Sequence, residues 1–171
     1  IYAGAQKNLG PAGATLVIIR DDFLKTAKQD IPIIFRYGTH ADKKSMYNTP
    51  PTFPIYIVSE VLKWVKENGS IAGMEKLNTA KKERIYQLMD LYPDYFKGTA
   101  QMDSRSWMNI TMRLPNEELE KKIIAEATPK GFSGLKGHRS VGGLRASIYN
   151  AFPTSGVEEL VQFMADFKAN N

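Results

Sequence analysis

Lys7 stands alone among glycines in the stretch GAQKNLGPAG, where Gly4 precedes it and Gly10, Pro11 and Gly13 follow. Glycine and proline are typical of tight turns and of unusual backbone dihedral angles. A lysine amine becomes a nucleophile when burial or a cationic neighbour removes its proton. Because lysine is mostly a surface residue, the stretch alone favours an exposed turn, and a positioned reactive amine is the alternative.

A second group of polar residues lies in KGHRSVGGLRAS, residues 136–147, which contains His138, Arg139 and Arg145 between glycines. Arginine presents a planar fork that matches a carboxylate or a phosphate, and histidine adds a donor whose charge changes near neutral pH. Glycines let a ligand approach the backbone closely. The stretch is equally compatible with an anion site and with a solvated basic loop.

A third group lies in SMYNTPPTFP, residues 45–54, where Asn48 and Thr49 come just before two prolines and an expected helix start. Side-chain oxygens and the unpaired N–H groups at a helix N-terminus can bind phosphate. An ordinary capping turn has the same residue types, and the pattern alone favours it.

The elements that would position Lys7 form an incomplete domain over residues 1–74. IYAGAQ and ATLVIIR indicate two strands joined by the glycine turn, and DDFLKTAKQ indicates a short helix. The run LVII is apolar on both faces, as in a strand buried inside a sheet, but the chain does not supply enough partner strands. Residues 30–54 hold four of the nine prolines and indicate a long ordered loop.

The remaining elements indicate a small α/β domain over residues 75–171. Apolar spacing predicts a pair of helices before it, over 52–68 in the first part and over 71–91 across the boundary, the second with lysines on its outer face. MNITMRL and LRASIYN are expected strands, and each is followed by an expected helix. The last helix has Ser155 as its possible N-cap.

Composition excludes several classes of site. The chain has no cysteine and only two histidines, so disulfides and thiolate metal sites are excluded and we expect no metal. A net charge of +5 suits anionic small substrates or nucleic acid, but the lysines are spread along helices rather than clustered in one arm. No run of about 20 apolar residues predicts a membrane span. We expect a cytoplasmic protein as the default.

The three polar stretches together resemble the phosphoserine aminotransferase family, class V members of the fold type I enzymes that use pyridoxal 5'-phosphate (PLP). GAQKNLGPAG, NTPPTFPIY and KGHRSVGGLRASIYNA are similar to that family's signatures, in the same order. The resemblance covers the whole chain but only about the second half of a full enzyme. It implies a remnant of the large PLP-binding domain in residues 1–74, followed by the small C-terminal α/β domain in residues 75–171.

For the cofactor, the resemblance implies that Lys7 is the catalytic residue that binds PLP and moves the substrate proton. Asn48 and Thr49 match the turn that reaches the PLP phosphate of the partner subunit in a homodimer. The aspartate that pairs with the cofactor's ring nitrogen would lie upstream of Lys7. This chain starts at Ile1, directly in strand-like sequence, so we expect a C-terminal piece that is inactive by itself.

For the substrate, the resemblance implies that Arg145 grips the α-carboxylate, while His138 and Arg139 lie near the side-chain phosphate or carboxylate. The implied reaction moves an amino group from glutamate to 3-phosphohydroxypyruvate, in serine biosynthesis. Two alternatives remain open. One is another transaminase of the same fold, acting on alanine or glyoxylate, and the other is a basic nucleic-acid-binding module.

Overall fold

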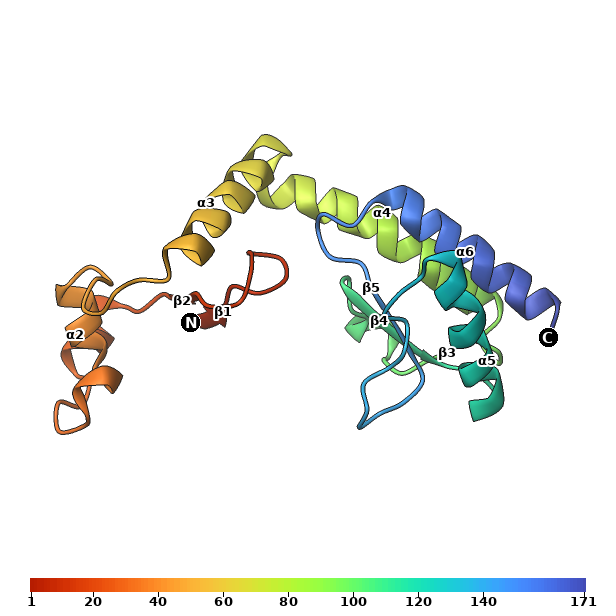
Figure 1. Cartoon of the computed structure of the whole chain (residues 1–171), viewed down its shortest axis with the longest axis horizontal. Coiled ribbons are helices and arrows are strands. Elements are labelled where there is room, and N and C mark those ends of the chain that lie inside the picture. The colour runs from red at the N-terminus through yellow and green to blue at the C-terminus, as the bar shows by residue number, and fades with distance from the viewer. The chain divides into compact units, whose positions relative to one another are not determined.

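The computed structural model describes all of residues 1–171, which form two compact units, Ile1–Glu67 and Asn68–Asn171 (Figure 1). The sequence places a domain boundary after residue 74, a position that lies inside helix α4 (Ser70–Leu91). That helix belongs as a whole to the second unit. The assignment of the two parts to the large and small domains of an aminotransferase stays a prediction.

A two-stranded antiparallel sheet opens the first unit. Its strands β1 (Tyr2–Gly4) and β2 (Thr15–Val17) are the two strands expected on either side of the glycine turn. Leu16, Val17 and Ile18 remain 52%, 42% and 57% exposed. The strand whose composition indicates burial inside a sheet is therefore uncovered in this chain, as the shortage of partner strands predicts.

Three short helices follow β2. The expected helix is α1 (Asp21–Lys25), with two acidic residues in its first turn. The expectation of a loop over residues 30–54 is wrong in part, because this segment contains the 3-10 helix η1 (Ile33–Phe35) and the helix α2 (Tyr37–Asp42). Helices of three to six residues are too short to show the apolar periodicity by which helices are found in sequences.

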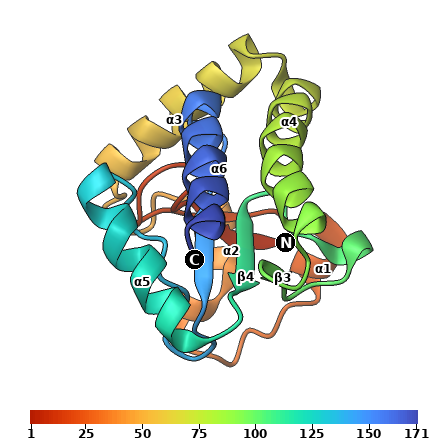
Figure 2. The same cartoon turned by 90° about the vertical axis from the view of Figure 1, so that its right-hand side faces the viewer.

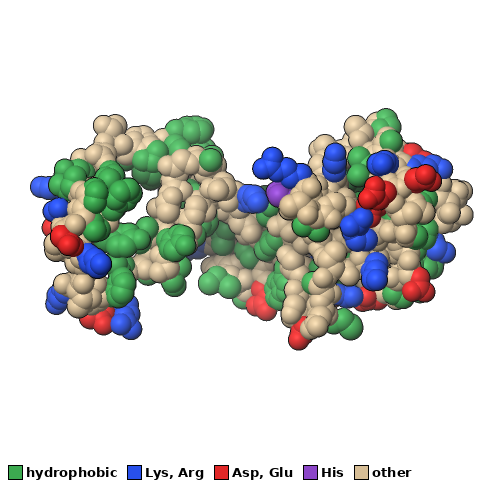
Figure 3. Space-filling view, turned by 90° about the horizontal axis from the view of Figure 1, so that it is seen from below, with side chains coloured by type: hydrophobic (Ala, Val, Ile, Leu, Met, Phe, Trp, Pro, Cys, Tyr) green, Lys and Arg blue, Asp and Glu red, His purple; other side chains and the backbone are tan.

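The last helix of the first unit, α3 (Thr52–Glu67), begins and ends close to its expected bounds. None of its residues is fully buried, and Ile55 and Leu62, which form part of its apolar stripe, are about half exposed. Ala5 is the only fully buried apolar residue of this unit. In the space-filling view, hydrophobic side chains accordingly gather over the first unit (Figure 3).

The second unit consists of three helices on one face of a three-stranded antiparallel sheet (Figure 2). The helices are α4, α5 (Glu117–Ala127) and α6 (Thr154–Ala169). The strands, in spatial order, are β3 (Lys97–Gly98), β4 (Asn109–Arg113) and β5 (Leu144–Ser147). No helix of either unit combines the length and apolar character of a membrane span.

The core of the second unit lies between the sheet and the helices. Alternate residues of β4 and β5 are buried, with Ile110 directly opposite Ala146. Ile85 of α4, Ile123 of α5 and Val157 of α6 pack into the same cluster with no exposed surface. This continuous core makes the second unit a folding unit by itself, unlike the first.

Four details differ from the sequence-based expectations or add to them. The strand β3 was not expected, because two residues carry no alternation. Ser155 is not an N-cap, because α6 begins at Thr154, directly after Pro153. Asn116 is the N-cap of α5, and its side chain accepts from the Leu119 N–H at 2.9 Å. The lysines of α4 are not all on its outer face, because Lys81 is fully buried.

The uncovered apolar surface of the first unit predicts self-association. Static light scattering of the 171-residue chain is expected to give a mass above that of one chain, rising with protein concentration, because exposed strand edges and apolar side chains pair between molecules. A piece comprising residues 68–171 serves as the control and is expected to stay monomeric. A clean, stable monomer of the whole chain would contradict this prediction.

The core assignment predicts opposite outcomes for two isoleucines of α4. Replacing the fully buried Ile85 by alanine is expected to lower the free energy of unfolding of residues 68–171 by about 2–5 kcal/mol, because it leaves a cavity. Ile71→Ala, at a position that is 83% exposed, is expected to change it by less than about 0.5 kcal/mol. Urea unfolding followed by circular dichroism measures both, and equal effects would refute the assignment.

Candidate active site

Lys7 lies at the head of the glycine turn that joins β1 to β2. Its backbone is left-handed, with φ of 81°, which costs a non-glycine residue free energy. The turn is closed by the Ala5 N–H, which donates to the Ala14 carbonyl at 2.9 Å, and the Lys7 side chain is exposed. Strained conformations of this kind concentrate at functional sites, so the geometry supports a positioned lysine.

The glycines of the turn let it rest directly on α3. A Cβ on Gly10 would lie 3.1 Å from a methyl carbon of Val58, and one on Gly13 would lie 3.1 Å from the ring of Pro54. Both glycines also have positive φ, 154° and 113°. The turn that carries Lys7 is therefore seated against the N-terminal half of α3, and larger residues would lift it away.

Asn48 and Thr49 lie in the exposed segment just before α3. The first hydrogen bond of that helix runs from the Ile55 N–H to the Pro51 carbonyl at 3.1 Å, so the N–H groups of Thr52 and Phe53 have no helical acceptor. The structure thus brings the lysine turn and the Asn48–Thr49 segment to the same end of one helix. Their roles stay predictions.

His138 and Arg139 lie at the tip of a hairpin-like loop that leads into β5. Its two arms are joined by hydrogen bonds from the Gly137 N–H to the Gly143 carbonyl, 2.8 Å, and from the Arg145 N–H to the Leu135 carbonyl, 2.7 Å. Both tip side chains are exposed. The sequence motif therefore forms a fixed loop that presents a histidine and an arginine to solvent.

The hydrogen bonds of the tip set the tautomer of His138. The Ser140 N–H points to the His138 Nδ1 atom at 3.3 Å, and the Ser140 hydroxyl lies 2.7 Å from the same atom. Because a backbone N–H can only donate, Nδ1 is an acceptor and the ring proton lies on Nε2. The outward-facing nitrogen is thus a donor, which suits an anionic ligand.

Two glycines of this loop have no room for a side chain. A Cβ on Gly143, whose φ is 68°, would lie 2.5 Å from the Met112 carbonyl oxygen. A Cβ on Gly137 would lie 1.9 Å from the Gly142 carbonyl oxygen. Close contact between the loop arms and β4 therefore requires glycine at both positions.

An ion pair between Arg113 and Glu120, which the sequence did not predict, supports the loop that carries His138 and Arg139. The Arg113 Nε donates to the buried carboxylate of Glu120 at 2.6 Å, and a terminal nitrogen of Arg113 donates to the Val141 carbonyl at 3.2 Å. The Glu120 carboxylate also accepts from the Leu114 N–H. The hydrogen bond between Arg113 and Glu120 raises the pKa of Arg113. No sequence signal reveals this pair, because it joins a strand to a helix.

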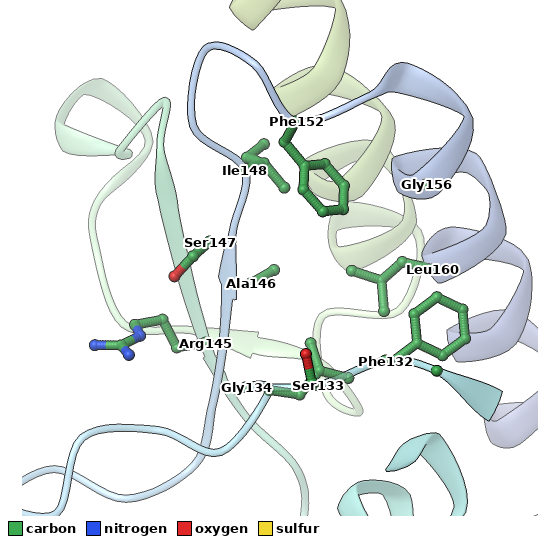
Figure 4. Close-up of a pocket in the computed structure, with 12 residues that line it drawn as sticks. Phe132, Ser133, Gly134, Arg145, Ala146, Ser147, Ile148, Phe152, Gly156 and Leu160 are labelled. Carbon is green, nitrogen blue, oxygen red and sulfur yellow. The ribbon is translucent and has the colours of Figure 1, made fainter. Parts of the chain in front are cut away.

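Arg145 lies on β5 opposite Thr111, on the face of the sheet away from the helices. Figure 4 shows Arg145 and Ser147 pointing to one side of the strand, whereas Ala146 points toward Leu160 and an apolar pocket of about 280 Å³. The Arg145 Nε atom is buried and has no hydrogen-bond partner, and its guanidinium forms no ion pair. An unpaired guanidinium on a strand fits a carboxylate ligand.

The predicted site residues thus form two groups. In the first unit, the turn that carries Lys7 contacts the N-terminal half of α3 through Gly10 and Gly13, and Asn48 and Thr49 lie just before the same helix. The other three lie on β5 and the loop that precedes it, in the second unit: His138, Arg139 and Arg145. The first group contains an amine and polar groups of the kind that can bind phosphate, and the second contains side chains of the kind that can bind an anion.

Comparison with known proteins agrees with these features. The chain is 56% identical over 168 residues to phosphoserine aminotransferase of Lysinibacillus sphaericus, covering 98% of this chain and 46% of that protein. It is also 56% identical over 172 residues to phosphoserine aminotransferase of Syntrophobacter fumaroxidans, covering 100% of this chain and 47% of that protein. The chain therefore spans about half the length of the curated relatives that it matches.

Solved structures give the same result. The phosphoserine aminotransferase from Bacillus circulans subsp. alkalophilus superposes with a TM-score of 0.96 and 52% identity, over 99% of this chain and 47% of that one. The PLP-bound phosphoserine aminotransferase from Trichomonas vaginalis superposes with a TM-score of 0.89 and 40% identity, over 96% and 47%. The α/β fold expected from the sequence is confirmed. The family described as aminotransferase class V matches residues 1–160, and the chain belongs to that family.

Proposed function

We propose that this chain is part of a phosphoserine aminotransferase, which moves the amino group of glutamate to 3-phosphohydroxypyruvate and yields 2-oxoglutarate and phosphoserine. The observation that carries the proposal is the similarity over the whole chain to proteins of that name, at up to 56% identity. The products place the enzyme in serine biosynthesis. We further propose a cytoplasmic homodimer.

PLP is the proposed cofactor of the complete enzyme, as in the Trichomonas vaginalis relative. The residues present fit it, because the glycines hold the turn against α3 and a single lysine with a left-handed backbone lies at the head of that turn. Asn48, Thr49 and the unpaired N–H groups at the start of α3 suit a phosphate group. When bound, PLP withdraws electrons from the substrate's α-carbon. Lys7 then holds and moves the proton at that carbon.

The substrate contacts follow from the second group of residues. Arg145 would bind the carboxylate that glutamate and 3-phosphohydroxypyruvate share, since its guanidinium has no protein partner. His138, with its proton on Nε2, and Arg139 would bind the distal phosphate or carboxylate. Arg113 positions this loop through the Val141 carbonyl.

The relatives' names favour phosphoserine chemistry over a transaminase for alanine or glyoxylate. No feature of the structure favours a nucleic-acid-binding module. We propose that the 171-residue chain alone is inactive, because it spans about half of its relatives and contributes only part of a catalytic centre.

The proposed role of Lys7 is tested by reductive labelling. In a protein of full family length that contains this chain, borohydride reduction with PLP is expected to attach a pyridoxyl group to Lys7. Lys7→Ala should remove the label and lower kcat by about 10²- to 10⁴-fold. Lys44, which also has positive φ and an exposed side chain, is the matched control, and Lys44→Ala should keep both label and activity.

Two results would contradict the proposal. One is a label on a lysine other than Lys7, which would assign the cofactor elsewhere. The other is measurable turnover of glutamate and 3-phosphohydroxypyruvate by the 171-residue chain alone, which would show that these residues are sufficient for catalysis.

A further inference from the structure

Lys81 is a buried charged residue that the site described above does not use. It lies in the middle of α4, its side chain is 0% exposed, and it forms no ion pair. Its Nζ atom lies 2.6 Å from the Tyr149 carbonyl oxygen and 3.2 Å from the carbonyl oxygens of Ile148, Asn150 and Phe152. All four oxygens belong to the segment that follows β5.

Burying this amine has a cost, since desolvation lowers the pKa of Lys81. An apolar side chain of similar volume would avoid that cost but would offer no donor to four carbonyl oxygens. One turn earlier on α4, the Asn78 amide donates to the Asn150 side chain at 2.8 Å. Lys81 therefore fixes the backbone of residues 148–152 through hydrogen bonds that an apolar residue could not make.

The fixed segment continues the row of side chains that includes Arg145. Alternate residues of a strand share one face, and Arg145 and Ser147 point to the same side of β5 (Figure 4). The Ser147 hydroxyl and the Tyr149 hydroxyl both donate to the Asn109 Oδ1 atom, at 2.9 and 3.2 Å. Tyr149 is thus held at its carbonyl by Lys81 and at its hydroxyl by Asn109.

Arg145 has no such anchor of its own. Its guanidinium forms no hydrogen bond or ion pair that would orient it, and its Nε atom is buried without a partner. Its direction therefore depends on the backbone of β5 and on the side chains beside it. The loop before β5 fixes one end of that strand, and the Lys81 contacts fix the chain at the other end.

We propose that Lys81 is a positioning residue for Arg145, acting on β5 through the backbone of residues 148–152 and through the Tyr149–Asn109–Ser147 hydrogen bonds. This inference rests on the proposed function, because it takes Arg145 to bind the carboxylate of both substrates. It concerns binding and not proton movement. Loss of Lys81 should therefore weaken the binding of both substrates alike and leave the rate of the chemical step unchanged.

The test is steady-state kinetics of Lys81→Met in a protein of full family length that contains this chain. The KM values for glutamate and for 3-phosphohydroxypyruvate are expected to rise by the same factor, about tenfold, because both substrates present the same carboxylate to Arg145. The kcat value is expected to stay within about twofold of the wild-type value, because the weakened contact between Arg145 and the carboxylate is equally strong in the ground state and in the transition state.

Two control variants separate positioning from general stability. Lys76→Met removes an exposed lysine from the same helix and should leave both KM values unchanged. Val157→Ala creates a cavity in the core and should lower the unfolding temperature without raising either KM value. A KM rise in Val157→Ala equal to that in Lys81→Met would overturn the proposal.

A second variant keeps the proposal testable if Lys81→Met does not fold. Tyr149→Phe removes only the hydroxyl that donates to Asn109 and leaves the carbonyl oxygen that Lys81 binds. It should raise both KM values by about threefold, as expected for one hydrogen bond. Unchanged KM values, or a change for one substrate only, would refute the inference. A wild-type protein without transaminase activity would instead refute the proposed function.

Discussion

The register between β4 and β5 decides what each face of the second unit's sheet can do. Ile110 lies opposite Ala146, and both point into the core beneath the helices, while Thr111 lies opposite Arg145 on the other face. A slip of one residue would exchange the two faces, bury the guanidinium and expose the core. The apolar core therefore holds Arg145 outward, so that folding and the proposed carboxylate binding depend on the same pairing.

The candidate site also contains features that stability alone would not favour. Lys7 has a left-handed backbone, Gly143 touches the carbonyl of the neighbouring strand, and Lys81 is buried without a carboxylate partner. The backbone of Lys7 and the burial of Lys81 cost free energy, whereas Gly143 stands where no other residue fits; each lies where it fixes a side chain or a loop of the proposed site. In the first unit, the turn that carries Lys7 packs against α3, although this unit buries only one apolar residue.

Much of the fold could be predicted because long helices and alternating strands leave periodic apolar patterns, as in α3, α6 and β4. The short elements β3 and α2 leave none, since they have only two and six residues. The candidate site residues were recognised from motifs that are local in sequence. Lys81 was missed because its partners come from a distant segment and a lysine in a helix predicts an exposed face. Glu120 was missed because its partner Arg113 lies on a strand, so that no helical spacing links the two residues.

The central claim is that the outward face of β5 binds the carboxylate common to both substrates. Arg145→Lys, in a protein of full family length that contains this chain, tests it most directly, because it keeps the charge and removes the planar fork. We predict that the KM values for glutamate and 3-phosphohydroxypyruvate both rise by about 10- to 100-fold. Unchanged KM values for both substrates would contradict the account.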